Sequence, residues 1–153
     1  MTLQTVALPD DPALKQVLSA LSAEGAQALV VGGAVRNALL GEPISDIDIA
    51  TSARPAETVR LAEAAGLRTV PTGLDHGTIT IIAGGRGYEA TTFRRDVETD
   101  GRHAVVAYSD SIEEDARRRD FTMNALYATA DGRVLDPVGG LSDLAARKLR
   151  FVG

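Results

Sequence analysis

The sequence predicts a mixed α/β (α+β) domain in which a mixed, antiparallel sheet is flanked by helices. Three observations predict this class. Apolar residues recur at helical spacing between capping signals, short β-rich runs are joined by glycine turns, and the two kinds of segment alternate along the chain. At 153 residues the chain has the length of one domain with one hydrophobic core.

The N-terminal third is predicted to contain two helices around one strand. Asp11–Pro12 offers a helix cap and a first-turn proline, and Gly25 supplies the stop. The apolar run 28–31 indicates a strand that leads through Gly32–Gly33 into a helix over 34–40. Four apolar residues recur at helical spacing in the first helix: Leu14, Val17, Leu18 and Leu21.

The middle of the chain is predicted to supply most of the sheet. Residues 46–49 alternate acidic and β-branched side chains, which predicts a strand with one acidic face. Pro55 begins another helix. Two β-rich runs, 78–82 and 88–93, are joined by a glycine-rich turn and predict a hairpin.

The last third is predicted to begin with a mobile loop, because residues 94–110 are polar and show no sustained period. A capping box at Ser111 then starts a helix that carries three arginines. Runs at 126–129 and 133–135 predict a second hairpin, and residues 141–149 have a helical pattern.

Composition limits the classes of site. The chain has no Cys and two His, which excludes disulfides and Cys nucleophiles and leaves a zinc site short of ligands. Any metal is therefore expected to be a hard cation on oxygen ligands. The net charge of -5 predicts weak RNA binding by this chain alone. No signal segment and no apolar run of the ~18–20 residues that span a membrane is seen, so a cytoplasmic location is expected.

Asp46 and Asp48 are the centre of the functional interpretation. Residues two apart in a strand point to the same face, so both carboxylates are expected to project together while Ile47 and Ile49 are buried opposite. Mg²⁺ is typically held by one or two carboxylates plus substrate phosphates. The pair indicates phosphoryl or nucleotidyl transfer, and the alternative is the solvated face of an edge strand.

Gly32–Gly33 lies between the apolar strand and the helix start, where backbone N–H groups and the helix dipole favour a phosphate. Arg36, one turn into the helix, can add a bidentate contact. The alternative is a tight turn that needs glycine for its backbone angles alone. The segment is neither a dinucleotide fingerprint nor a Walker A loop.

Three motifs follow one another: Gly-Gly-Ala-Val-Arg at 32–36, Asp-Ile-Asp at 46–48, and Arg-Arg-Asp-Phe-Thr-Met-Asn-Ala-Leu at 118–126. Together they resemble the motif set of the tRNA nucleotidyltransferase (CCA-adding enzyme)/poly(A) polymerase family, class II type. The resemblance implies the N-terminal catalytic head domain of that family, with a polymerase-β-like nucleotidyltransferase fold. It also implies that Asp46 and Asp48 are Mg²⁺ ligands.

The resemblance further implies roles for residues of the first motif. Gly33 and Arg36 match the glycine and arginine that contact the incoming triphosphate, and Gly32 precedes them in the same nucleotide-binding turn. One position departs from the family pattern. Asn37 stands where the family commonly has Asp, so an ion pair or hydrogen bond of that carboxylate is lost or replaced by an amide.

In the third motif, Arg119 matches the arginine that contacts the nucleotide, and Asp120 and Asn124 would help order the sugar. Glu89 resembles a third catalytic carboxylate that positions the metals or the 3′-hydroxyl, and a surface Glu in a hairpin is the alternative. Arg117 is more typical of a solvated helix face beside Glu113, Glu114 and Asp115. His76 is more typical of a turn residue than of a base.

The activity implied by the resemblance is Mg²⁺-dependent transfer of CMP or AMP from CTP or ATP to the 3′-hydroxyl of tRNA, in CCA addition or in poly(A) polymerase-type synthesis. The chain, 1–153, is expected to be one head domain without the family's neck, body and tail, which tight tRNA binding would need. Two alternatives remain: a nucleotide-binding module or fragment without turnover, and a scaffold domain that kept the fold and lost the site.

Overall fold

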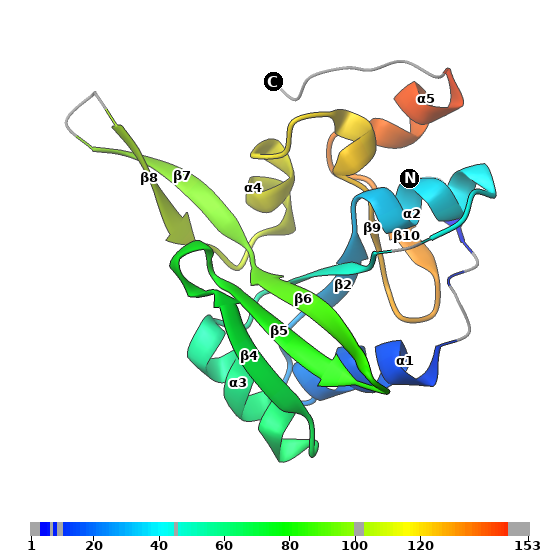
Figure 1. The fold of residues 1–153 in the computed structure, drawn as a ribbon. Helices are drawn as coiled ribbons and strands as arrows, with labels where there is room; N and C mark the ends of the chain where they lie inside the picture. Colours follow the sequence, from blue (N-terminus) through cyan, green and yellow to red (C-terminus); the bar gives the residue numbers. More distant parts are fainter. Residues whose placement is uncertain (1–3, 7, 9–10, 45, 100–102, 147–153) are drawn as a thin grey trace.

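The computed structural model describes residues 4–6, 8, 11–44, 46–99 and 103–146. Within them, eight strands form a sheet in the order β1-β10-β9-β2-β3-β6-β5-β4, and β7 and β8 form a separate two-stranded ribbon (Figure 1). The strand pairs are antiparallel except for β3 and β6, which are parallel. The predicted class, a mixed sheet flanked by helices, is confirmed.

The elements have the following bounds. The strands are β1 (Gln4–Thr5), β2 (Ala28–Val31), β3 (Asp48–Thr51), β4 (Arg68–Gly73), β5 (Thr78–Ala83), β6 (Arg86–Thr92), β7 (Arg94–Thr99), β8 (His103–Tyr108), β9 (Tyr127–Ala128) and β10 (Arg133–Leu135). The helices are α1 (Pro12–Ser22), α2 (Gly33–Leu40), α3 (Pro55–Ala64), α4 (Ile112–Arg117) and α5 (Gly140–Ala145), with 3₁₀ turns η1 (Leu74–His76) and η2 (Thr122–Asn124). No helix of the described part is long and apolar enough to cross a membrane.

Strand register gives the sheet two different faces. Val30, Ile49 and Ala90 are paired across β2, β3 and β6, and all three are buried in the main core. The helices α1 and α3 lie side by side against this face (Figure 1). Because side chains alternate along a strand, the next row points to the opposite face, and it contains Asp48 and Glu89.

The opposite face carries a smaller apolar cluster. Leu29 and Val31 of β2 pack there with Phe93, with Ala116 of α4 and with Tyr127 of β9. This cluster fixes α4 and the segment after it against the sheet, beside the row that holds the two acidic residues. The acidic row therefore borders a packed surface rather than open solvent.

The helices and strands predicted between residues 11 and 93 are observed with shifted boundaries: β3 is Asp48–Thr51 where 46–49 is predicted, and β6 is Arg86–Thr92 where 88–93 is predicted. Asp11 caps α1 by accepting a hydrogen bond from Ala13 N at 3.0 Å, and Gly41 ends α2 in the left-handed conformation. The acidic strand, however, begins at Asp48 and not at Asp46. Val31 pairs with Asp48, and at Gly32 the chain turns into α2, so residues before Asp48 have no partner on β2.

The mobile loop predicted over 94–110 is wrong, because β7 and β8 form an antiparallel ribbon that projects away from the sheet (Figure 1). The ribbon pairs only with itself among the described strands, so its residues need no apolar face and show no period. The strands β1 and β4 were also not predicted. The predicted helix over 141–149 is observed as Gly140–Ala145, and residues 147–149 lie outside the described residues.

Candidate active site

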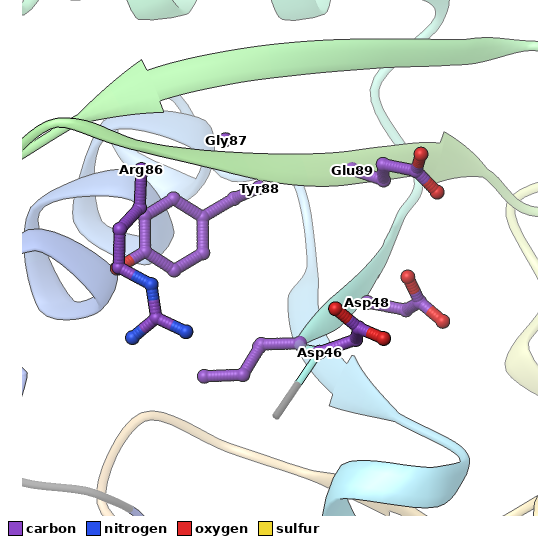
Figure 2. A pocket seen from close by; sticks show the side chains of 7 residues that line it. Asp46, Asp48, Arg86, Gly87, Tyr88 and Glu89 are labelled. Carbon is purple, nitrogen blue, oxygen red and sulfur yellow. The ribbon is translucent and has the colours of Figure 1, made fainter. Parts of the chain in front are cut away.

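The three acidic residues predicted as catalytic line one cavity of about 540 Å³. We call it the carboxylate cavity; its lining residues are Asp46, Ile47, Asp48, Arg86, Gly87, Tyr88 and Glu89. Figure 2 shows the carboxyl groups of Asp46 and Asp48 side by side, with that of Glu89 projecting from the neighbouring strand. The structure therefore brings these three predicted residues together.

The common direction of the two aspartates has a local cause. Ile47 and Ile49 are 7% and 1% exposed and are anchored in the main core, while Asp46 and Asp48 between and before them are exposed. The alternation thus extends past the strand end to Asp46. Across the sheet, Asp48 is in register with Glu89 on the parallel strand β6.

The electrostatics of this row favour a bound cation. The pKa of Asp48 is raised, first because the surrounding protein removes water from its carboxyl; the positive charge of Arg119 lowers this pKa, and the negative charge of Asp46 raises it. A divalent cation between the two carboxylates would relieve their repulsion. Among the described residues, no group of three or more His, Asp or Glu side chains could hold a metal by itself. The oxygen donors fit Mg²⁺ if phosphate oxygens complete its coordination.

The glycine turn lies directly beside the acidic row. Gly32 follows Val31, which pairs with Asp48, and it has a φ of 76°, a conformation that favours glycine. Its N–H donates to the Leu126 carbonyl at 3.0 Å, and its carbonyl accepts from Arg36 N at 3.0 Å. A Cβ at Gly33 would lie 3.4 Å from Nη2 of Arg36, so the guanidinium folds back over the start of α2.

A chain of hydrogen bonds joins Arg36 to the third motif. Arg36 Nη1 donates to Asn124 Oδ1 at 2.8 Å, and Asn124 Nδ2 donates to Asp120 Oδ1 at 3.3 Å. The pKa of Asp120 is lowered, first by the hydrogen bond from Phe121 N. Four of the predicted nucleotide-binding residues therefore form one contiguous group with the glycine turn: Gly33, Arg36, Asp120 and Asn124.

Asn37 continues the hydrogen-bond network from Arg36 towards the connection between α2 and β3. Its Oδ1 accepts from Arg36 Nε at 3.2 Å, and its Nδ2 donates to the Pro43 carbonyl at 3.1 Å. Pro43 precedes Asp46 in the connection between α2 and β3. The amide therefore uses both of its functions, and a carboxylate could reproduce only the contact with Arg36.

Arg119 forms a hydrogen-bonded group with Asp115 and Tyr127. We call these three residues the Asp115 centre. Asp115 is 3% exposed and accepts from Arg119 Nη2 at 2.9 Å and from the Tyr127 hydroxyl at 2.6 Å. Arg119 Nε donates to the same hydroxyl at 3.1 Å, and the guanidinium lies 5.5 Å from the Tyr127 ring centroid. Burial lowers the pKa of Arg119, but Tyr127 and Asp115 raise it more, so the side chain stays charged.

The sequence pattern does not single out Asp115 or Tyr127, the two residues that hold Arg119. The helix α4 ends at Arg117, so Arg118 and Arg119 lie beyond it, and not on it as the sequence predicts. The four-residue spacing still brings the side chains of Asp115 and Arg119 together, although the acidic cluster is more typical of a solvated face. Tyr127 follows Leu126 in an apolar run, and no local signal marks its hydroxyl as a partner. Their role depends on packing between α4 and β9.

Two residues interpreted as non-catalytic lie away from the carboxylate cavity. His76 is the exposed last residue of η1, and its carbonyl accepts from Arg94 Nη1 at 3.2 Å. Arg117 is exposed and lines a different cavity, of about 200 Å³, together with Arg118 and Asp96. Neither residue lines the carboxylate cavity, in agreement with the interpretation from the sequence.

Comparison with known proteins gives one family for nearly the whole chain. The family model described as the poly A polymerase head domain matches residues 28–150. A CCA-adding enzyme of Latilactobacillus sakei is 48% identical over 139 residues, which cover 90% of this chain and 34% of the relative. The chain thus spans about a third of the length of the curated relative.

Solved structures agree with this similarity. The Bacillus stearothermophilus CCA-adding enzyme in complex with CTP is 39% identical with a TM-score of 0.82, over 96% of this chain and 34% of that one. A tRNA nucleotidyltransferase complexed with a primer tRNA and an incoming ATP analogue is 30% identical with a TM-score of 0.69, over 90% of this chain and 39% of that one. Both similarities cover about the same fraction of the larger chains.

Proposed function

Since the chain belongs to the poly A polymerase head domain family and has its polymerase-β-like nucleotidyltransferase fold, we propose that it is a head module that transfers CMP or AMP from CTP or ATP to the 3′-hydroxyl of tRNA. The observation that carries the proposal is one row across three neighbouring strands. In this row Val31, which precedes the glycine turn, is paired with Asp48, and Asp48 is paired with Glu89.

The triphosphate is proposed to lie over Gly32–Gly33, where backbone N–H groups at the start of α2 attract anions. Arg36 donates to the phosphates from the side, held in place by Asn124. Arg119, fixed by the Asp115 centre, binds the nucleotide, and Asp120 and Asn124 order its sugar. These donors are in place before the substrate binds, which lowers the cost of ordering them.

The proposed roles in nucleotidyl transfer follow the order of the groups across the sheet: the glycine turn after β2, Asp48 on β3 and Glu89 on β6. Glu89 accepts a hydrogen bond from the 3′-hydroxyl and takes its proton as the oxygen attacks the α-phosphorus. A new bond forms between the 3′-oxygen and the α-phosphorus, the bond to the β-phosphate oxygen breaks, and pyrophosphate leaves. Asp46 and Asp48 would hold Mg²⁺, which supplies positive charge against the charge of the triphosphate.

Pyrophosphate release from CTP or ATP, measured with Mg²⁺ and a tRNA that lacks its 3′ end, tests the proposal. Release that is lost in Asp46→Asn and in Asp48→Asn supports it. Asp75→Asn is the matched control, because Asp75 is an exposed aspartate of η1 outside the carboxylate cavity. Nucleotide binding without release would instead favour a module without turnover, and absence of Mg²⁺-dependent nucleotide binding would favour a scaffold.

A further inference from the structure

The carboxylate cavity extends beyond the three acidic residues. Its other end is lined by Arg86 and Tyr88 (Figure 2). This extension exists because β6 begins at Arg86, whereas the parallel strand β3 begins only at Asp48, opposite Glu89. The residues of β6 before Glu89 therefore have no partner on β3, and they border the cavity along this edge.

Arg86 is held at this end of the cavity while half of its side chain stays exposed. Its Nη1 lies 3.8 Å from Asp11 Oδ2, its guanidinium lies 5.9 Å from the Tyr88 ring centroid, and the side chain is 53% exposed. Tyr88 donates from its hydroxyl to the same Asp11 oxygen at 2.5 Å. Asp11 is itself fixed as the cap of α1. A positive charge is thus positioned at the far end of a cavity whose other charges are negative.

The order of the site residues decides which substrate meets this charge. The proposed triphosphate site follows β2, Asp48 lies on β3 and Glu89 lies on β6. In an in-line displacement the attacking oxygen and the leaving oxygen lie on opposite sides of the phosphorus. With pyrophosphate leaving toward the glycine turn, the attacking hydroxyl has to enter from the side of β6. That is the side on which Arg86 lies.

We propose, on the basis of the function proposed above, that Arg86 binds a backbone phosphate of the RNA strand whose 3′-hydroxyl reaches Glu89. A guanidinium matches phosphate geometry with two parallel donors. Arg86 and Glu89 are three positions apart on β6, a rise of ~10 Å at about 3.3 Å per residue, and although strand side chains alternate between faces both residues line the carboxylate cavity. A backbone phosphate at that distance from Glu89 belongs to a linkage close to the 3′ end of the strand.

The test is binding of a short single-stranded RNA with a free 3′-hydroxyl to this chain, followed by fluorescence anisotropy over a series of low salt concentrations. Arg86→Ala is expected to weaken binding about tenfold and to reduce the slope of log K against log salt by about 0.7, the contribution of one phosphate contact. Arg86→Lys keeps the charge and is expected to recover the slope. Arg133→Ala is the matched control, because Arg133 is 58% exposed and lies 3.5 Å from Asp131.

A second arm locates the contact on the RNA. Uncharged methylphosphonate linkages are placed singly at the terminal positions of the RNA. At one position, the methylphosphonate is expected to weaken RNA binding to the unaltered chain about as much as Arg86→Ala weakens binding of the unmodified RNA. The same methylphosphonate is expected to cause no further loss of binding to the Arg86→Ala variant. If the role of Arg86 were purely structural, the losses of RNA-binding free energy caused by Arg86→Ala and by the methylphosphonate would add. Equal slopes for the chain and for Arg86→Ala, additive losses, or no RNA binding at low salt would each overturn the inference.

The outcome is separable from that of the proposed function. Affinity for CTP in the presence of Mg²⁺ is measured in parallel, for the unaltered chain and for Asp48→Asn. If the unaltered chain does not bind CTP, the proposed function fails whatever the RNA result. If CTP binding is present and depends on Asp48, but Arg86→Ala leaves RNA binding unchanged, only the assignment of Arg86 fails.

Discussion

The carboxylate cavity and the Asp115 centre both place charged groups near the proposed substrate site, but they are built in opposite ways. In the Asp115 centre, a buried carboxylate satisfies a guanidinium and a hydroxyl, and each of these partners contacts the other. In the carboxylate cavity, Asp46 and Asp48 are exposed, and the pKa of Asp48 is raised, first by desolvation and further by the negative charge of Asp46.

The difference separates two tasks of the site. The Asp115 centre is electrostatically complete without a ligand, so it can hold Arg119 in one orientation before the nucleotide arrives. The like charges of Asp46 and Asp48 repel each other, so the carboxylate cavity gains most when a cation binds. Changes in the first region should therefore affect stability, and changes in the second should affect catalysis.

The largest expected effect is on catalysis, in the carboxylate cavity. Asp48→Asn is expected to lower the rate of pyrophosphate release by about 10³-fold or more, since a metal-held charge is worth several kcal/mol in such a reaction. Single-turnover release with CTP and the shortened tRNA measures it. Far-ultraviolet circular dichroism should show an unchanged fold. A rate within tenfold of the unaltered chain would remove Asp48 from the mechanism.

The next effect is on stability, in the Asp115 centre. Asp115→Ala leaves a partly buried guanidinium without its carboxylate and is expected to cost about 3–5 kcal/mol of unfolding free energy. Asp96→Ala is the control, because Asp96 pairs with Arg118 at 2.8 Å but is 55% exposed, and it should cost less than about 1 kcal/mol. Urea unfolding measures both. Equal losses would contradict the conclusion that the buried carboxylate of Asp115 stabilises the fold more than an exposed ion pair does.

Tyr127→Phe sharpens the same comparison, because it removes only the hydroxyl from the Asp115 centre. The loss of its hydrogen bonds with Asp115 and Arg119 is expected to cost about 1 kcal/mol and to weaken CTP binding several-fold. Calorimetric titration with CTP and Mg²⁺ gives the affinity. Tyr108→Phe, at an exposed tyrosine, should change neither quantity, and an unchanged CTP affinity in Tyr127→Phe would separate this hydroxyl from nucleotide binding.

Asn37 connects Arg36, one of the proposed nucleotide-binding residues, to Pro43 in the segment that leads to Asp46 and Asp48. Asn37→Asp keeps an acceptor for Arg36 but loses the donor to the Pro43 carbonyl, and is expected to weaken Mg²⁺-dependent CTP binding by about two- to tenfold. Asn37→Ala loses both contacts and should weaken it further. If Asn37→Asp binds CTP as well as the unaltered chain, the hydrogen bond to Pro43 does not position the site.

The smallest effect is a pH dependence with opposite signs at two aspartates. The folded chain raises the pKa of Asp48, so without Mg²⁺ its stability falls as pH rises from the ordinary pKa of 3.8 through the raised value. Asp48→Asn is therefore expected to raise the melting temperature at neutral pH. The increase should be less than ~2–4 °C, the shift that corresponds to 1 kcal/mol in a domain of this size.

At Asp120 the folded pKa is lowered, so its contribution to stability is present above the ordinary pKa and is lost as pH falls through the folded value. Asp120→Asn should accordingly lower the melting temperature at neutral pH. Thermal melts of both variants across the acid range, without Mg²⁺, provide the comparison. A shift of the same sign in the two variants would contradict the assigned causes.

The sequence predicted the parts of this molecule that depend on local pattern. Capping residues, helical spacing and glycine turns were sufficient for α1, α2, α3 and the β5–β6 hairpin. The ribbon of β7 and β8 was missed because a strand pair outside the sheet needs no apolar face, and β4 was missed in a segment that contains Pro71. In each case the strand is defined by its partner and not by its own residues.

The candidate site divides in the same way. Asp46, Asp48 and Glu89 could be predicted from spacing and from family resemblance, and the structure places them around one cavity. Asp115 and Tyr127 could not, because their hydrogen bonds join α4 to β9 through packing between distant segments. Arg86 was not singled out either, since it reaches the cavity only because β6 extends past the start of β3.

The most direct test of the account is a structure of this chain with Mg²⁺ and a non-hydrolysable CTP analogue. We expect one ion in contact with the carboxylates of both Asp46 and Asp48 and with phosphate oxygens, and a triphosphate that lies over Gly32–Gly33. An ion that contacts neither aspartate, or a triphosphate bound away from the glycine turn, would contradict it.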